Sequence, residues 1–192
     1  MRVVFILRGG PVRPQRWSDT EFVCENVSVS DFDPDRHLYG DPGAAVRIVE
    51  YGDFQCPGCK MLAPVLKQLI DESGGRICLV FRHFPVFEVH PFALTAALAA
   101  EASGDRFWEM HEQLYTHQDH LDDDSLAEYA ERAGVAGAVT GLQAQQFKAG
   151  ISADYTLGID EGVRATPALF INGSRYEGPF ELDALRAATT GH

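Results

Sequence analysis

Two cysteines separated by two residues mark a sharp change of hydrophobic pattern, and this junction restricts the fold more than any other feature of the chain. Ahead of Cys56, the apolar stretch over residues 45–51 predicts a short buried strand. Behind it, Pro57 suits the first turn of a helix, because the N–H that proline lacks would be unpaired there anyway. The apolar residues that follow have helical spacing: Met61, Leu62, Val65, Leu66, Leu69 and Ile70. The sequence therefore predicts a strand and a helix joined by a turn that carries both cysteines.

The rest of the pattern places this junction in an α/β fold. A second strand is predicted over residues 77–84, and Pro85 closes it. Between about residues 90 and 150 the chain becomes rich in Ala and Glu with Gly breaks, which indicates an inserted helical subdomain. The remaining expected elements are a helix over 152–161, a strand over 168–171, a turn at Asn172-Gly173, a strand over 175–177 and a helix from Phe180.

The expected organisation is one domain with an appended arm. A chain of 192 residues, of which 45% are apolar, can bury one sizeable core. Residues 1–40 combine turn-rich pieces with strand-like alternation over 21–29, and are interpreted as an N-terminal arm or extra strands. Residues 41–192 are predicted to form the main domain, which includes the helical insertion.

Charge and hydropathy exclude several classes of partner. The formal net charge of -12 would repel a phosphate backbone, and no Lys/Arg-rich stripe interrupts it, so neither nucleic acid nor an anionic membrane surface is expected. The longest apolar runs fall far short of the ~20 residues that cross a bilayer, so no membrane insertion is expected. The first seven residues lack the long apolar core and cleavage site of a secretory signal. We therefore expect a cytoplasmic protein, with the cell envelope as the alternative if a leader is missing.

The cysteine pair has the spacing that thiol-disulfide exchange requires. This chemistry needs one thiolate that attacks and a second thiol that resolves the mixed disulfide. Unpaired N–H groups at a helix N-terminus lower the pKa of a thiol below its free value of about 8.5, which makes Cys56 the candidate nucleophile. Cys59 lies one helical turn further on, with Cβ atoms about 5–6 Å apart, and is the candidate resolving thiol. Pro57 and Gly58 influence the redox potential, but the sequence does not fix the direction in which the reaction runs.

Metal binding is the main alternative for these residue types. One Cys-x-x-Cys is half of many zinc sites, but no second Cys-x-x-Cys or Cys-x-x-His follows at the usual spacing. His111, His117 and His120 could be imagined as metal ligands on a helix, yet they are interpreted as surface or helix-packing residues. Residues 122–124 are interpreted as the acidic start of a helix. No metal and no cofactor are expected.

Several residues keep open roles at this point. Glu50 or Asp53 could act as an acid/base group for Cys59, or could equally be a surface or strand carboxylate. Cys78, inside an apolar run, is interpreted as a small buried hydrophobe, and Cys24 as an edge-strand thiol or a third redox partner. The Thr166-Pro167 pair precedes a strand, and composition alone assigns it no role.

Five ordered stretches, spread over about residues 41–185, resemble the DsbA-like branch of the thioredoxin superfamily, in its bacterial subset with a helical insertion. They read VEYGDFQCPGC from Val49, FRHFP from Phe81, HP from His90, FWEMH from Phe107 and ATPALFING from Ala165. The resemblance implies a thioredoxin-like fold in which Cys56 is the exposed nucleophile and Cys59 its partner. It also implies that Pro167 is a cis-proline packed beside the disulfide. The backbone of Thr166 would then pair with an extended substrate.

The function implied is that of a thiol-disulfide oxidoreductase acting on protein thiols and disulfides or on small thiols. Whether it works as an oxidase, an isomerase or a reductase stays open. One rival is an isomerase or transferase of the related glutathione-dependent branch, which uses a Ser at the nucleophile position; the intact cysteine pair argues against it. The other rival is a redox-responsive chaperone or binding module, in which the cysteines merely respond to oxidation.

Overall fold

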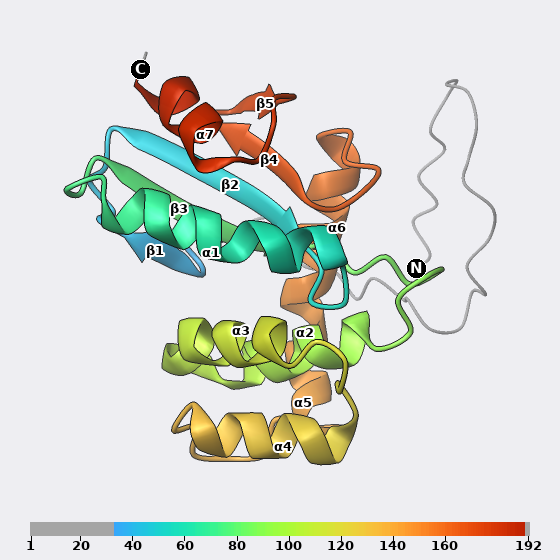
Figure 1. Ribbon diagram of the computed structural model, residues 1–192. Coiled ribbons are helices and arrows are strands. Elements are labelled where there is room, and N and C mark those ends of the chain that lie inside the picture. The colour runs from blue at the N-terminus through green and yellow to red at the C-terminus, as the bar shows by residue number, and fades with distance from the viewer. Residues whose placement is uncertain (1–32, 191–192) are drawn as a thin grey trace, which may run out of the picture.

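A five-stranded mixed sheet carries the cysteine motif in the computed structural model, which describes residues 33–190 (Figure 1). The strand order is β1-β3-β2-β4-β5, and only β2 and β3 run parallel. The strands are β1 (Leu38–Gly40), β2 (Val46–Gly52), β3 (Ile77–His83), β4 (Ala168–Ile171) and β5 (Ser174–Tyr176). The two parallel strands lie in the middle of the sheet, so both of their faces are covered, as is usual for parallel strands.

One face of the sheet packs against α1 (Pro57–Asp71) and α7 (Leu182–Thr189). Val46 and Ile48 of β2 lie in the core formed with these helices. Because side chains alternate along a strand, Glu50 faces the same side two residues later, directly ahead of the cysteine motif. On the other face, Tyr51 and Phe170 belong to a separate aromatic core, to which Tyr155 of α6 (Lys148–Asp160) adds its ring.

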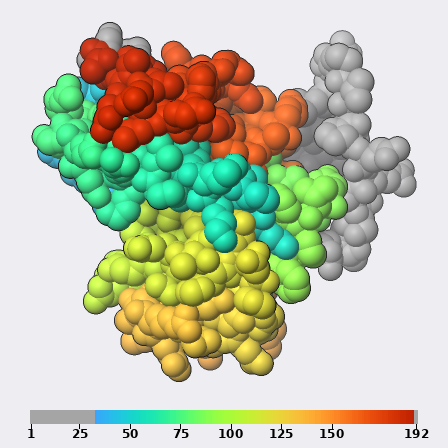
Figure 2. Space-filling model, in the orientation of Figure 1, coloured from blue at the N-terminus to red at the C-terminus, as the bar shows by residue number. Residues whose placement is uncertain are grey.

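The helical insertion forms a second lobe beneath α1 (Figure 2), and its core also takes in Phe54, Phe81 and both motif cysteines. Its elements are α2 (Ala93–Ala102), the 3-10 turn η2 (Gly104–Arg106), α3 (Phe107–Thr116), α4 (Asp123–Arg132), α5 (Gly141–Ala144) and the 3-10 turn η3 (Gln145–Phe147). Asp122 caps α4, since its carboxylate accepts a hydrogen bond from the N–H of Ser125 at 3.1 Å. The acidic run is therefore a helix start, as predicted.

A buried charged network ties the insertion to the sheet. The carboxylate of Asp154 on α6, which is wholly buried, accepts hydrogen bonds from the Arg82 guanidinium and from the backbone N–H of His83 on β3. The guanidinium of Arg36, ahead of β1, contacts both Asp154 and Glu101 of α2. Buried charges are stable only when they are paired in this way, so the network fixes one arrangement of the two lobes.

The predicted α/β fold with an inserted helical subdomain is confirmed, and two differences are informative. Strand β1 falls within the predicted arm and was not predicted as a strand; it is three residues long and pairs with β3, so no local pattern marks it. The predicted strand-like segment over 21–29 lies outside the described residues, and the division into residues 1–40 and 41–192 stays a prediction. Between residues 33 and 190 no helix has the length and apolar character needed to cross a bilayer.

Candidate functional site

Cys56 occupies the N-cap of α1, with extended backbone angles of φ -76° and ψ 122°, and Pro57 follows as the first helical residue. The N–H of Cys56 donates to the carbonyl of Asp53 at 3.0 Å, which closes a tight turn between β2 and α1. The Cys56 carbonyl accepts the first intrahelical hydrogen bond, from the N–H of Lys60 at 3.1 Å. The predicted strand-to-helix turn is therefore present, with the candidate nucleophile at the positive end of the helix.

The structure brings Thr166 and Pro167 against the cysteine motif, although more than a hundred residues separate them along the chain. The Cys56 thiol lies 3.3 Å from the carbonyl oxygen of Thr166 and donates to it. A Cβ added to Gly58 would lie 3.0 Å from Cδ of Pro167 and 3.7 Å from Sγ of Cys56, so the lack of a side chain permits this approach. The Thr166-Pro167 peptide bond is cis.

The two thiols differ sharply in their protonation. A hydrogen bond from the Cys59 thiol is the main reason that the pKa of Cys56 is lowered to about 5. Burial opposes this shift, and the side-chain hydroxyl of Thr166 and the N–H groups of Cys59 and Gly58 support it. Burial raises the pKa of Cys59 well above its usual range, and the nearby charges of Cys56 and Glu50 raise it further. The lowered pKa of Cys56 matches the sequence prediction, although the neighbouring thiol contributes more than the helix end does.

Cys56 is less accessible than the resemblance implied, since only 7% of the residue is exposed and Cys59 is fully buried. Both are free thiols in this structure. The expected exposed nucleophile is thus corrected to a largely buried one, with Pro167 close to the motif and the Thr166 carbonyl in contact with its sulfur.

The two candidate carboxylates turn out to have different environments. Glu50 is fully buried, and neither of its carboxylate oxygens has a hydrogen-bond partner within residues 33–190. Burial, followed by the charge of Cys56, raises the pKa of Glu50 to about 8. Asp53 is also buried, but its carboxylate accepts hydrogen bonds from the N–H of Gln55 at 2.7 Å and of Val86 at 2.8 Å, and contacts Nδ1 of His90 at 2.7 Å. Asp53 is therefore a structural residue of the loop, whereas Glu50 is poised to exchange a proton.

Sequence reasoning missed one residue that holds the motif from the insertion. The side-chain amide of Gln118, at the end of the α3 segment, donates to the carbonyls of Phe54 at 2.8 Å and of Cys56 at 2.9 Å. A glutamine 62 residues from its partner, with no periodic pattern around it, gave no signal in the sequence. The contact of His90 with Asp53 ties it to the same loop.

The burial of three histidines agrees with their interpretation as surface or helix-packing residues. His111 is buried inside α3, His117 stacks on Tyr129, and His120 is exposed. A different set comes together within residues 33–190: ligand atoms of His37, His83 and Glu101 lie within 4.8 Å of one another. The guanidinium of Arg36 already contacts the same Glu101 oxygen that both imidazoles approach. These three residues therefore belong to the buried charged network.

The remaining cysteines take no part in the site. Cys78 is buried in β3, as predicted, and burial raises its pKa. Cys24 lies outside the described residues, so both of its predicted roles stay open.

Comparison with known proteins agrees with this geometry. A family model described as thioredoxin matches residues 33–189. The thiol-disulfide exchange protein alpha-DsbA2 of Wolbachia pipientis is 25% identical, with a TM-score of 0.72 over 83% of this chain and 88% of that chain. A periplasmic thioredoxin-like protein of Salmonella enterica serovar Typhimurium is 23% identical, with a TM-score of 0.71 over 83% of this chain and 90% of that chain.

Among proteins similar in sequence, the Na(+)/H(+) antiporter NhaA 1 of Salinispora arenicola is 40% identical over 170 residues, which is 82% of this chain and 25% of the antiporter. The chain thus spans about a quarter of the length of the relatives it matches. These findings contradict the predicted cytoplasmic location, because antiporters and the periplasmic protein belong to the cell envelope. That prediction relied on the first seven residues, which lie outside the described part of the chain.

Proposed function

Since the chain belongs to the thioredoxin family, in its DsbA-like branch, we propose that it is a thiol-disulfide oxidoreductase that exchanges disulfides with protein or small thiol substrates. Cys56 serves as the nucleophile and Cys59 as the resolving thiol. The observation that carries this proposal is the position of Cys56, a free thiol at the N-cap of α1, with Cys59 one turn further on and the Thr166 carbonyl 3.3 Å from its sulfur. The pKa of Cys56, lowered to about 5 while that of Cys59 is raised, agrees with this arrangement. At neutral pH the pair therefore holds one reactive thiolate and one thiol in reserve.

In the oxidising direction, a substrate thiolate attacks Sγ of Cys56 in the disulfide form. The Cys56–Cys59 bond breaks, Cys59 leaves with the electron pair, and a mixed disulfide joins substrate and Cys56. A second substrate thiolate then attacks the substrate sulfur, which releases Cys56 as a thiolate and leaves the substrate oxidised and the pair reduced. Because its pKa is low, Cys56 is a good leaving group in this second step. In the reducing direction the same steps run backwards.

In this proposal, Glu50 exchanges a proton with Cys59. Because the pKa of Cys59 is raised, its thiolate takes up a proton after it leaves, and its thiol must lose a proton before it can attack. With its own pKa raised to about 8, Glu50 carries a proton at neutral pH and can release it within the normal working range. The interaction between the Glu50 and Cys59 charges supports this role, because neither group ionises easily beside the other.

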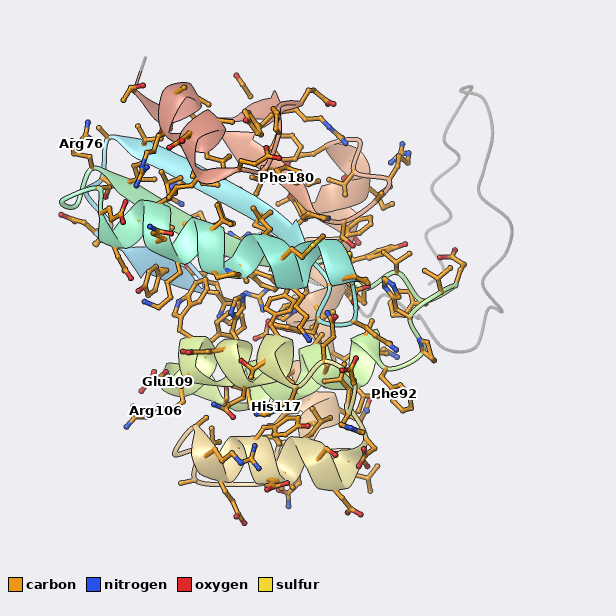
Figure 3. The ribbon with its side chains drawn as sticks, viewed as in Figure 1. Arg76, Phe92, Arg106, Glu109, His117 and Phe180 are labelled. Carbon is orange, nitrogen blue, oxygen red and sulfur yellow. The ribbon has the colours of Figure 1, made fainter. Side chains whose placement is uncertain are left out.

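Substrate contacts are proposed for Pro57, Gly58, Thr166 and Pro167, which surround the Cys56 sulfur. An extended peptide can pair with backbone groups near Thr166, a mode of recognition that needs little side-chain specificity. Exposed Phe92 adds apolar surface beside the motif: its N–H donates to the Gln55 side chain at 2.7 Å, and its ring points away from the insertion (Figure 3).

The low pKa of Cys56 favours the oxidising direction, because a stabilised thiolate favours the reduced pair over its disulfide. We expect a reduction potential between those of thioredoxin (~ -270 mV) and DsbA (~ -120 mV). Equilibration of the pair with glutathione buffers, followed by mass analysis of the two forms, measures it. A potential at or below that of thioredoxin would contradict the oxidising direction, and a pair that no buffer converts between its two forms would overturn the proposed function.

A further inference from the structure

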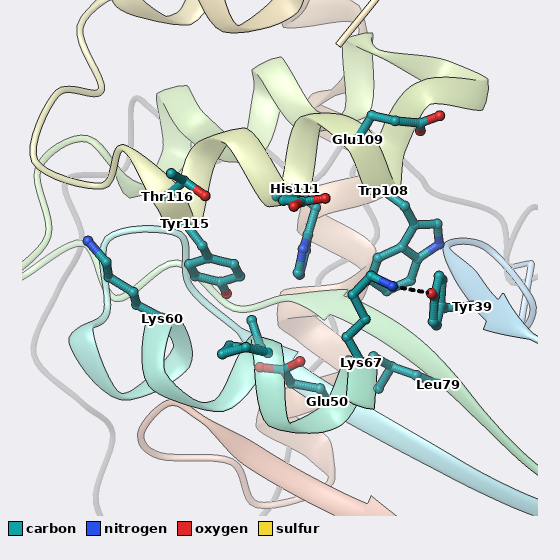
Figure 4. Close-up of a pocket in the computed structure, with 13 residues that line it drawn as sticks. Tyr39, Glu50, Lys60, Lys67, Leu79, Trp108, Glu109, His111, Tyr115 and Thr116 are labelled. Atoms are coloured by element: carbon teal, nitrogen blue, oxygen red, sulfur yellow. Dashed lines mark hydrogen bonds between the residues drawn. The ribbon is translucent and has the colours of Figure 1, made fainter. Parts of the chain in front are cut away.

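A cavity of about 650 Å³ separates α1 from α3 (Figure 4). Its volume lies within the range of small-molecule binding sites, about 300–1,000 Å³. Lys60 and Lys67 of α1 stand on one rim, and Glu109, Glu112 and Thr116 of α3 stand on the other. The cavity is thus open to solvent between the two lobes and reaches inward as far as Glu50.

The floor of the cavity holds two buried polar groups that lack partners. Of the described residues, only Glu50, His83 and His111 have buried side-chain nitrogen or oxygen atoms without a hydrogen bond of good geometry. His83 still lies 3.1 Å from the Glu101 carboxylate, whereas Glu50 and His111 both line this cavity. Figure 4 shows His111 projecting from α3 into the space above Glu50. Buried polar groups in proteins are nearly always paired, so two orphans that face one cavity indicate an occupant that can hydrogen-bond to them.

Aromatic rings form the wall between this floor and the rim. The rings of Tyr39 and Trp108 lie 5.1 Å apart, and Leu79 and Ala63 extend the apolar surface. Both rings are held in place: the indole N–H of Trp108 donates to the carbonyl of Leu38 at 3.0 Å, and Lys67 donates to the Tyr39 hydroxyl at 2.8 Å. With their polar atoms engaged, these side chains present ring surface to the cavity, which suits a flat apolar body.

The floor carries little charge at neutral pH. Burial raises the pKa of Glu50 to about 8, so that its carboxyl is mostly protonated. Burial lowers the pKa of His111 to about 3, so that its imidazole is neutral. The occupant therefore meets one O–H donor and neutral acceptors, and an ion placed there would lose its hydration without a countercharge.

We propose that this cavity is a binding site for a small, neutral aromatic molecule whose single amide or hydroxyl group hydrogen-bonds to Glu50 and His111 while its ring lies against Trp108 and Tyr39. The site also adjoins the redox pair: its lining residues Lys60 and Ala63 follow Cys59 on the first turns of α1, and Ala63 packs against the core that contains both cysteines. The charge of Cys56 also raises the pKa of Glu50. If the proposed function holds, the Cys56 thiolate of the reduced form keeps Glu50 protonated and favours a ligand that accepts its hydrogen bond. By reciprocity that ligand raises the reduction potential, by ~30 mV for each tenfold preference.

Benzamide is the probe, and Trp108 is the reporter once Trp17, the other tryptophan, is replaced by Phe in the full chain. We expect a saturable change in Trp108 fluorescence that is larger at equal benzamide concentration for the reduced than for the oxidised protein. Benzoate, which has the same shape and a charge, should bind at least about tenfold more weakly. Ala63→Leu fills the cavity and should weaken benzamide at least about tenfold; Ala187→Leu, exposed on α7, is the matched control and should bind normally.

A second variant, His111→Phe, tests the same site if Ala63→Leu does not fold. It removes one hydrogen-bonding group and should weaken benzamide binding about tenfold. A cavity that holds only water would give no saturable response up to the solubility of benzamide, and that result would overturn the proposal. Unchanged binding in both variants would do the same. Equal affinity for the two redox forms would contradict the coupling. Binding is measured without thiol chemistry, so it can persist even where the proposed exchange activity fails.

Discussion

Replacing Cys59 with serine is expected to stop the reaction at a mixed disulfide between Cys56 and its substrate. With oxidised glutathione as the substrate, Cys56 attacks and becomes glutathionylated, and no second thiol is present to release the glutathione. Serine keeps an O–H donor beside Cys56, which is the interaction that contributes most to its low pKa. We expect nearly complete conversion to the adduct, measured by intact mass, and a fall of at least about 10³-fold in insulin-disulfide turnover.

The control is Cys56→Ser, which should form no adduct and should lose turnover to the same extent. Both variants are made in a Cys24→Ser background, so that a thiol outside the described residues cannot resolve the adduct. Cys78 is buried and stays in place. An adduct on Cys59 in the Cys56→Ser protein, or full turnover by either variant, would show that the roles of the two thiols have been assigned wrongly.

Replacing Glu50 with glutamine should slow exchange and stabilise the fold at the same time. The substitution preserves size but removes the group proposed to exchange a proton with Cys59, so release of a mixed disulfide should slow by about 10²-fold at neutral pH. Pre-steady-state decay of the mixed disulfide measures this step. Glu112→Gln, on the rim of the same cavity, is the matched control and should leave the rate unchanged. A wild-type rate in Glu50→Gln would remove Glu50 from the mechanism.

The stability effect of the same variant has a defined pH window. The fold raises the pKa of Glu50 from its ordinary value of 4.5 to about 8. Between these two pH values the native state therefore holds a proton that the unfolded chain has lost. Wild-type stability therefore declines, through this group, as the pH rises from about 4.5 to about 8, by on the order of 5 kcal/mol in total. Glu50→Gln lacks this decline. Denaturant unfolding at pH 4 and pH 9 should show equal stabilities at the lower pH and a more stable variant at the higher one; the opposite order would contradict a buried, neutral Glu50.

Local patterns in the sequence were enough to predict the elements around the motif. The helix from Pro57 has apolar residues at helical spacing, while the strand before Cys56 and the strand from Ile77 are short apolar runs, and the structure reproduces all three within a few residues. Strand β1 was missed because three residues have no period, and its place depends on hydrogen bonds to β3. Helix α6 begins four residues before the predicted start, since the helix as a whole has little amphipathic pattern to mark its ends.

The candidate site was only partly visible in the sequence for the same reason. Spacing alone marked Cys56 and Cys59, while Thr166 and Pro167 were identified by resemblance, because nothing local brings a distant strand end to a helix N-terminus. Glu50 and Asp53 looked equivalent as sequence neighbours of the motif. Their hydrogen bonds separate them, since only Asp53 meets the N–H groups of an adjoining loop. Gln118 depends on the packing of the insertion against the sheet, which no sequence period encodes.

The pH dependence of Cys56 alkylation by iodoacetamide, measured on the reduced protein, tests the central claim that the fold keeps this thiol ionised. Because only the thiolate reacts, the rate follows its ionisation. The midpoint is expected near pH 5, with Cys59 unreactive throughout the titration. A midpoint near pH 8.5, the value of a free thiol, or alkylation of Cys59 ahead of Cys56, would contradict the account.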